Sequence, residues 1–186
     1  MKKILLIAVL GLASVAGFAQ QKFAHVNSQE LITLMPEADK AREVMEISSN
    51  EAQETYQSMI EEYQSKYSQY QQKGSTMSQS IREAKEKELT EISQRIQEFE
   101  QSIQMELQQQ QQQLMAPIYE KANNTIQDVA KKGGYIYVFD INSALYIDPA
   151  QSIDITPECR KILGIPADRT LESLQKELEA KANAAE

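Results

Sequence analysis

The chain has few of the residues on which catalytic and metal sites depend. Its 186 residues include one cysteine, one histidine and no tryptophan. A single cysteine excludes an intrachain disulfide. Nucleophilic catalysis needs a nucleophile, a base and an orienting group, and His25 and Cys159 are the only candidates for such roles. The patterns HExxH, CxxC, GxxxxGK[ST] and GxGxxG are all missing. We therefore expect no enzymatic activity, no cofactor and no metal site.

Basic residues and long apolar runs are also scarce. The 19 basic side chains face 27 acidic ones, and no basic stripe exists. This balance argues against nucleic acid as a partner, because phosphate neutralisation supplies most of that affinity. A membrane-spanning helix takes about 20 apolar residues. No run of that length occurs, so we expect no stable membrane insertion.

The first 19 residues have the composition of a secretory signal. Lys2 and Lys3 precede an apolar run over 4–15, and Gly17-Phe18-Ala19 offers the small residues that a signal peptidase requires. We predict a signal peptide over 1–19, cleaved near Ala19, and an exported mature chain. That chain keeps 17 basic and 27 acidic residues, a net charge of −10.

Residues 37–132 form a long polar stretch that contains one glycine and one proline. Its apolar residues repeat with the three-four spacing of a coiled-coil seam. The repeat consists of Tyr56, Ile60, Tyr63, Tyr67 and Tyr70, followed by Leu89, Ile92, Ile96, Phe99, Ile103, Leu107, Leu114 and Ile118. The spacing predicts long exposed helices rather than disorder. The six glutamines of 108–113 lie within this repeat, so we interpret them as a helix face and not as a linker.

Turn-forming residues interrupt this stretch once, at 73–78, where Gly74 is followed by serine and threonine. The break predicts a helical hairpin, that is, an arm over 37–132. At about 1.5 Å per residue, its shorter helix reaches ~54 Å.

The segments on either side of the arm have the patterns of strands and short helices. We predict a strand at 22–27, then a helix capped by Ser28 that ends near Met35-Pro36. After Gly133-Gly134 we predict a strand over 135–141, apolar on both faces and thus buried on both sides. A second strand at 144–147 would form a hairpin with it through a turn at 142–143.

The C-terminal part predicts one short helix and a polar extension. Thr156 is the expected N-cap, with Pro157 at the first helical position and the helix end at 163–164. Cys159 shares a face with Ile162 and Leu163, so we interpret it as a buried, inert thiol; an intersubunit disulfide or a reactive thiol is the alternative. Residues 165–186 form the extension, with a last helix over 171–184.

About three strands and a few short helices make too small a core for a stable body. We therefore expect other subunits to complete it, in a number that the residues themselves leave open. The fold class is α+β and mostly α: a long antiparallel helical hairpin plus a small β-containing body from residues 20–36 and 133–164.

Methionine and tyrosine side chains gather on the first helix of the arm and at its turn. Both residue types suit contact with varied partners, because methionine adapts its shape and tyrosine combines an apolar body with a polar end. The candidates for such contact are Met45, Met59, Tyr63, Tyr67, Tyr70 and Met77. Packing within the hairpin is the favoured alternative for Tyr63 and Tyr67, and Met77, in the turn, is the better candidate for exposure.

Several local motifs, in this order and spacing, resemble the Skp/OmpH-like family of periplasmic chaperones up to Gly164. These motifs are Phe23-Ala24-His25-Val26-Asn27, the glutamine-rich hairpin, Leu114-Met115-Ala116-Pro117-Ile118, Val129-Ala130-Lys131-Lys132-Gly133-Gly134-Tyr135, Tyr137-Val138-Phe139-Asp140, Ala144-Leu145-Tyr146 and Asp154-Ile155-Thr156.

The resemblance implies a periplasmic homotrimer in which strands of three subunits form the body and three arms enclose a cavity. The partners it implies are unfolded outer-membrane β-barrel proteins, held without ATP and protected from aggregation. We expect the trimer body to include Phe23, Val26, Ile136, Val138, Leu145 and Ile147. The alternative is an exported coiled-coil scaffold or adaptor that binds one folded partner.

Two features depart from well-known members of this family, whose arms are basic. Residues 51–106 carry 6 basic and 11 acidic side chains, a net charge of −5. No basic cluster for lipopolysaccharide is present, so no such binding residues are assigned. The extension from Ile165 onward lies outside the resemblance.

Overall fold

The computed structural model describes residues 22–185, so the predicted signal peptide lies outside the described residues. The described chain divides into two compact units. Residues 37–117 form one unit, here called the arm. Residues 22–36 and 118–185 form the other, here called the sheet unit.

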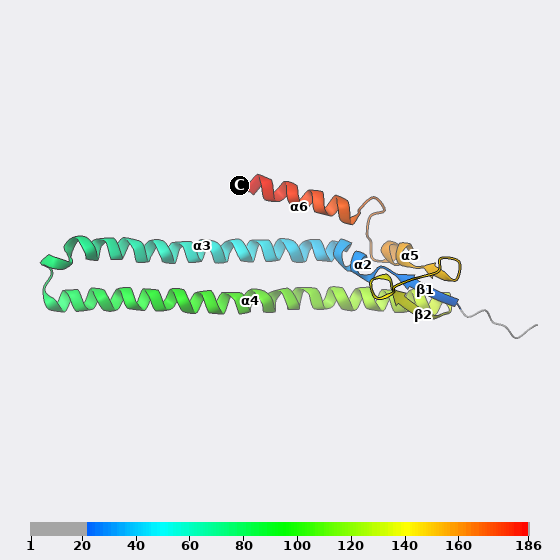
Figure 1. The fold of residues 1–186 in the computed structure, drawn as a ribbon, viewed down its shortest axis with the longest axis horizontal. Coiled ribbons are helices and arrows are strands. Elements are labelled where there is room, and N and C mark those ends of the chain that lie inside the picture. Colours follow the sequence, from blue (N-terminus) through cyan, green and yellow to red (C-terminus); the bar gives the residue numbers. More distant parts are fainter. Residues whose placement is uncertain (1–21, 186) are drawn as a thin grey trace, which may run out of the picture. The chain divides into compact units, whose positions relative to one another are not determined.

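The arm is built from one long helix and the first part of another, which run antiparallel (Figure 1). Helix α3 covers Pro36–Lys73, a 3-10 turn η1 covers Gly74–Thr76, and α4 covers Gln79–Gly133. The predicted hairpin and its turn are thus present. Helix α4 continues through the glutamine run and through Pro117 without interruption, which confirms that 108–113 is helix and not linker.

Apolar residues at the predicted spacing line the seam between the two helices, but one position is wrong. On α4 the predicted seam residues are half-buried or buried, and Ile92 and Ile96 are the most enclosed. On α3 the seam passes through Lys66 instead of its neighbour Tyr67, which is 43% exposed. Lys66 lies there because its ammonium pairs with Glu88 across the seam.

A three-stranded parallel sheet lies in the sheet unit. Strand β1 (Lys22–Val26) is central, with β2 (Tyr135–Asp140) on one side and β3 (Ser152–Asp154) on the other. Both neighbours run parallel to β1. Helix α4 ends just before β2, where Gly134 adopts a φ of 68° that favours glycine.

The predicted hairpin between 135–141 and 144–147 is wrong. A 3-10 turn η2 (Ile141–Ser143) follows β2, and residues 144–151 form no strand. The carboxylate of Asp140 accepts hydrogen bonds from the backbone N–H and the side chain of Asn142, which turns the chain away from β2. Asp148 accepts a further bond from the N–H of Ala150 and leads the chain into β3.

One face of the sheet is packed within the unit. Ala24 and Val26 of β1 are buried, and the helices α2 (Ser28–Leu34), α5 (Thr156–Ile162) and α6 (Leu171–Ala185) contribute to the same unit. Helix α2 packs against both α5 and α6. The other buried apolar side chains of this unit are Leu31, Leu34, Met35, Ile118, Ala122, Val129, Ile155, Cys159, Leu163, Ile165 and Leu174.

Both predicted helix caps are displaced by one residue. Asn27 caps α2, and its Oδ1 accepts a hydrogen bond from the backbone N–H of Glu30 at 3.0 Å. Ser28 instead donates to the Asp140 carboxylate at the end of β2. The Thr156 hydroxyl accepts from the N–H of Asn27 at 3.0 Å, and so joins α5 to the end of β1 rather than capping α5.

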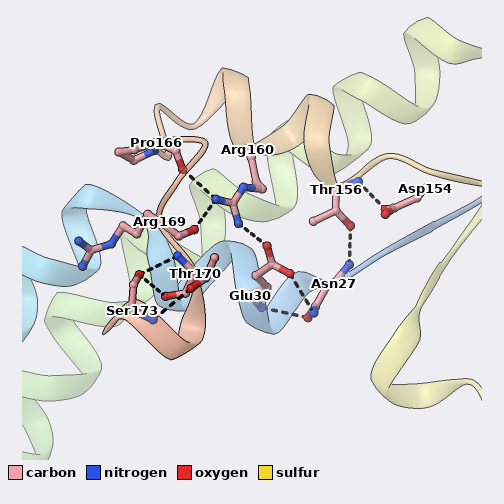
Figure 2. A network of polar contacts seen from close by, with 9 residues as sticks. All are labelled: Asn27, Glu30, Asp154, Thr156, Arg160, Pro166, Arg169, Thr170 and Ser173. Carbon is pink, nitrogen blue, oxygen red and sulfur yellow. Dashed lines mark hydrogen bonds and ion pairs between the residues drawn. The ribbon is translucent and has the colours of Figure 1, made fainter. Parts of the chain in front are cut away.

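Arg160 is the centre of a polar network that joins α2, α5 and the start of the extension (Figure 2). Its guanidinium donates to the Glu30 carboxylate, to the carbonyl of Pro166 at 2.8 Å and to that of Arg169 at 2.5 Å. The Arg160 and Glu30 side chains are only 15% and 24% exposed. Since Ile165 and Leu174 are buried as well, the first half of the extension is an integral part of the sheet unit.

We expect Arg160→Met to destabilise the folded protein by about 2–3 kcal/mol, because a part-buried carboxylate and two carbonyls lose a charged donor. Chemical denaturation followed by circular dichroism measures this change. Lys176→Met is the matched control, since the exposed Lys176–Glu172 pair is worth at most about 0.5 kcal/mol. Equal effects of the two substitutions would contradict the role of the network.

Candidate interaction surfaces

The second face of the sheet is open and aromatic. Neighbouring residues of parallel strands point to the same face, and Phe23 of β1 is aligned with Tyr137 of β2. Their rings stack at 6.3 Å, and the Tyr137 ring lies 6.1 Å from that of Phe139. Tyr137 is 61% and Phe139 49% exposed. Parallel sheets are normally covered on both faces, so this surface has the character of an interface.

Both edges of the sheet lack a strand partner within residues 22–185, because β2 and β3 are the outer strands. Leu145 and Tyr146, in the loop between η2 and β3, extend into solvent. The loop and the open face line an open pocket of about 550 Å³, to which Phe23 and Phe139 contribute. Unpaired edges and exposed aromatic side chains occur here on the same unit.

The residues predicted for the trimer body occupy different environments in the single chain. Val26 is buried in the core of its own unit, Phe23, Val138 and Ile147 are half-buried, and Ile136 and Leu145 are exposed. The prediction that the 135–141 strand is buried on both sides is wrong for one chain. Strand β2 lies at the edge of a three-stranded sheet, where one chain has too few neighbouring residues to bury both of its faces.

His25 lies on the open face of the sheet, where its Nδ1 is 2.9 Å from the hydroxyl of Ser152 on β3. This bond joins two adjacent strands and gives His25 a hydroxyl partner rather than a titratable one. The arrangement suits a structural contact better than acid–base catalysis.

Cys159 is fully buried on α5, as predicted. Burial, with the nearby carboxylates of Glu158 and Asp154, raises the pKa of its thiol to about 11. The reactive thiolate is therefore scarce at neutral pH.

We expect Cys159 to react with an aromatic disulfide reagent at least about 100-fold more slowly in the native protein than in denaturant. Stopped-flow absorbance measurements of the aromatic thiol released from the reagent give both rates. Comparable rates in the two conditions would show that the thiol is accessible.

The tyrosine and methionine candidates on the arm are mostly half-buried: Met45, Met59, Tyr63, Tyr70 and Met77. Tyr67 is the exposed member, and its ring stacks on that of Tyr63 at 5.9 Å. Met77, which we predicted to be a better candidate for exposure than Tyr63 and Tyr67, is less accessible than Tyr67. Four more exposed apolar residues were not predicted, namely Val44, Ile47, Ile81 and Met105. The one signal of their exposure in the sequence is that they fall outside the seam spacing.

An ion pair crosses the seam in the part of the arm near the turn. Lys66 of α3 pairs with Glu88 of α4, and Lys85 also donates to Glu88 at 2.6 Å. Hydrogen bonds from Lys66 and then Lys85 lower the pKa of Glu88 from 4.5 to about 2. The charged carboxylate therefore joins the helices above its ordinary pKa, and this link is lost as the pH falls towards 2.

We expect Glu88 to titrate near pH 2 in a carbon-detected NMR experiment on the native protein. Lys66→Gln should raise this pKa towards the ordinary value, while Lys85 still holds it below. An unchanged pKa in the variant would contradict the contact across the seam.

The described part of the chain contains no group of three or more histidine, cysteine or acidic side chains arranged to hold a metal ion. Among residues 22–185, no helix combines the length and the apolar character needed to cross a membrane.

Comparisons with known proteins agree with this architecture. Residues 22–163 match the family model of outer membrane protein (OmpH-like). The chain is 30% identical over 163 residues to the chaperone protein Skp of Yersinia enterocolitica. This alignment covers 87% of this chain and 98% of the relative. The crystal structure of a putative outer membrane chaperone (OmpH-like) from Caulobacter crescentus CB15 has a TM-score of 0.69 at 17% identity, covering 79% of this chain and 86% of that one.

Proposed function

The chain belongs to the OmpH-like family of outer membrane proteins, and we propose that it is a periplasmic, ATP-independent holdase. Its clients would be unfolded outer-membrane β-barrel proteins, which it shields from aggregation between the arms of a homotrimer. The match to the family over residues 22–163 is the observation that carries this proposal, together with the likeness to the Yersinia chaperone.

The open aromatic face of the sheet supports the assembly. This apolar surface consists of Phe23, Tyr137 and Phe139, and in a single chain it is exposed to water. Each Å² of apolar surface that association removes from water stabilises the assembly by about 25 cal/mol. The unpaired edges of β2 and β3 offer backbone groups for further strands. Copies of this chain would cover the face and pair the edges at once.

The properties of the arm support client binding. Barrel strands have one apolar face that aggregates in water. The arm presents scattered apolar side chains, among them Tyr67, Ile47 and Met105, on a polar surface. Several such arms would add many weak contacts to a useful avidity, while each contact remains reversible.

The test is dilution of a urea-unfolded barrel protein into buffer that contains the mature chain, followed by turbidity. We expect near-complete suppression at a stoichiometric ratio of trimer to client, with no change when ATP is added. Tyr137→Glu combined with Phe139→Glu should abolish most of the effect by preventing assembly. Tyr119→Glu, at an exposed helical position, is the control and should act as the unaltered chain does.

Two results would contradict the holdase. Full suppression at a ratio far below one to one would indicate a catalytic mechanism. No suppression, with binding of one folded partner in a fixed register, would favour an exported scaffold or adaptor.

A further inference from the structure

Charges are segregated along the arm. Residues 43–65 of α3 carry six carboxylates and residues 96–117 of α4 carry three, and neither segment contains a lysine or an arginine. We call these two segments the acidic section. Residues 66–95, which include the turn, carry six basic and four acidic side chains. The arm is therefore strongly negative in one part and slightly positive at its tip.

The two segments of the acidic section lie side by side. Ser48 Oγ accepts a hydrogen bond from Gln110 Nε2 at 2.9 Å. Tyr56 donates its hydroxyl to Glu100, and this bond raises the pKa of the tyrosine. These two polar contacts join the helices on either side of Ala52.

Packing is poor between these two contacts. Consecutive seam positions of α3 are occupied by the small residues Ser48 and Ala52, so they fill little of the space between the helices. The larger α4 residues of the same seam, Phe99, Ile103 and Leu107, remain only half-buried. Two helices alone cannot cover such side chains from the flanks.

Two grooves result, one on each side of the seam. Their volumes are about 520 and 530 Å³, and they share a floor of Ala52, Phe99, Ile103 and Leu107. Each groove lies entirely within the arm. Each is therefore a depression in which apolar side chains are reachable from solvent.

The rims of the grooves contain carboxylates and amides but no cation. Glu51 and Glu106 line the first groove, and Glu100 lines the second. The amides come from Gln109, Gln110 and Gln113 on one side and from Gln53 and Gln104 on the other. Glutamine both donates and accepts hydrogen bonds, so these side chains can satisfy the backbone of an extended peptide.

We propose that the grooves bind extended client segments in which apolar side chains are flanked by lysine or arginine. The apolar side chains would cover Phe99, Ile103 and Leu107, and the cations would lie beside Glu51, Glu106 and Glu100. This inference rests on the holdase function proposed above and names the class of segment that this arm selects. Electrostatic complementarity gives specificity and association rate more than affinity, which suits a site that must release its client.

Two fluorescent peptides test this selection on the full mature chain. Both contain the same alternating apolar core, flanked by three lysines in one and by three glutamates in the other. Fluorescence anisotropy at about 50 mM salt should give at least roughly tenfold tighter binding of the lysine peptide. This difference should shrink in 0.5 M salt, because the Debye length falls below about 5 Å. Equal affinities at low salt would overturn the proposal.

Matched variants locate the site. Glu51→Gln with Glu106→Gln removes two rim charges and should weaken the lysine peptide at least about fivefold. Glu43→Gln with Glu54→Gln removes two charges from the same section but from neither rim, and should weaken it less than about twofold. Equal losses would mean that the overall field of the arm, and not the grooves, attracts the peptide.

Ala52→Leu fills the floor of both grooves. We expect it to weaken the lysine peptide at least about fivefold while the thermal midpoint of the helices stays the same or rises, because the added side chain improves the seam. Unchanged peptide binding would overturn the proposal.

The turbidity assay distinguishes failure of the groove proposal from failure of the holdase proposal. If the unaltered chain suppresses aggregation but binds both peptides equally, the groove proposal alone is refuted. If it neither suppresses aggregation nor binds the lysine peptide more tightly, the holdase proposal is refuted as well.

Discussion

The structure depends on the parallel pairing of β1 with β2. A parallel pair requires a crossover connection, because the second strand must begin at the same end as the first. Here that connection runs from Asn27 to Gly134 and contains α2, α3 and α4. The helical hairpin is thus part of a greatly lengthened crossover connection between two neighbouring strands.

The same pairing leaves the sheet incomplete. Strand β1 has partners on both edges and a packed face beneath Ala24 and Val26, whereas β2 and β3 each keep an edge that no strand of residues 22–185 pairs. The aromatic surface of Phe23, Tyr137 and Phe139 has no cover within the described chain. One sheet of three short strands is marginal by itself, so association of copies is the physical answer that we propose.

The arm differs from the sheet unit in how its side chains pack. A pair of helices has a single seam, and this one alternates between apolar layers, such as Ile92 with Ile96, and the ion pair of Lys66 with Glu88. The polar layer fixes the register of the hairpin at a cost in apolar packing. The small residues Ser48 and Ala52 leave further surface accessible, which a binding arm needs and a rigid strut does not.

The regular elements could be predicted because their signals are local and periodic. The seven-residue spacing predicted both arm helices and the seam positions of α4, and Gly74 and Gly134 predicted where the helices end. The predictions that were wrong concern features that depend on tertiary contacts. Residues 144–147 have the apolar pattern of a strand, yet β1 takes 152–154 as its partner instead. Ser28 and Thr156 have the chemistry of caps, but their hydroxyls bond to Asp140 and to the N–H of Asn27.

The position of Tyr67 was missed for a related reason. Periodicity treats tyrosine as the better seam residue, whereas pairing with Glu88 brings the neighbouring Lys66 inward. The open sheet face could be inferred only in outline, since composition showed too small a core but not which side chains remain uncovered. The grooves of the arm arise from the size of facing residues, which a pattern of apolar positions does not record.

The most direct test of the account is the molar mass of the mature chain in solution, measured by light scattering during size-exclusion chromatography. We expect three times the mass of one mature chain, because in the assembly that we propose two further copies cover the open face and pair the edges of the sheet. A mass of one chain at micromolar concentration would contradict it, since the aromatic face would then be stable in water without a partner.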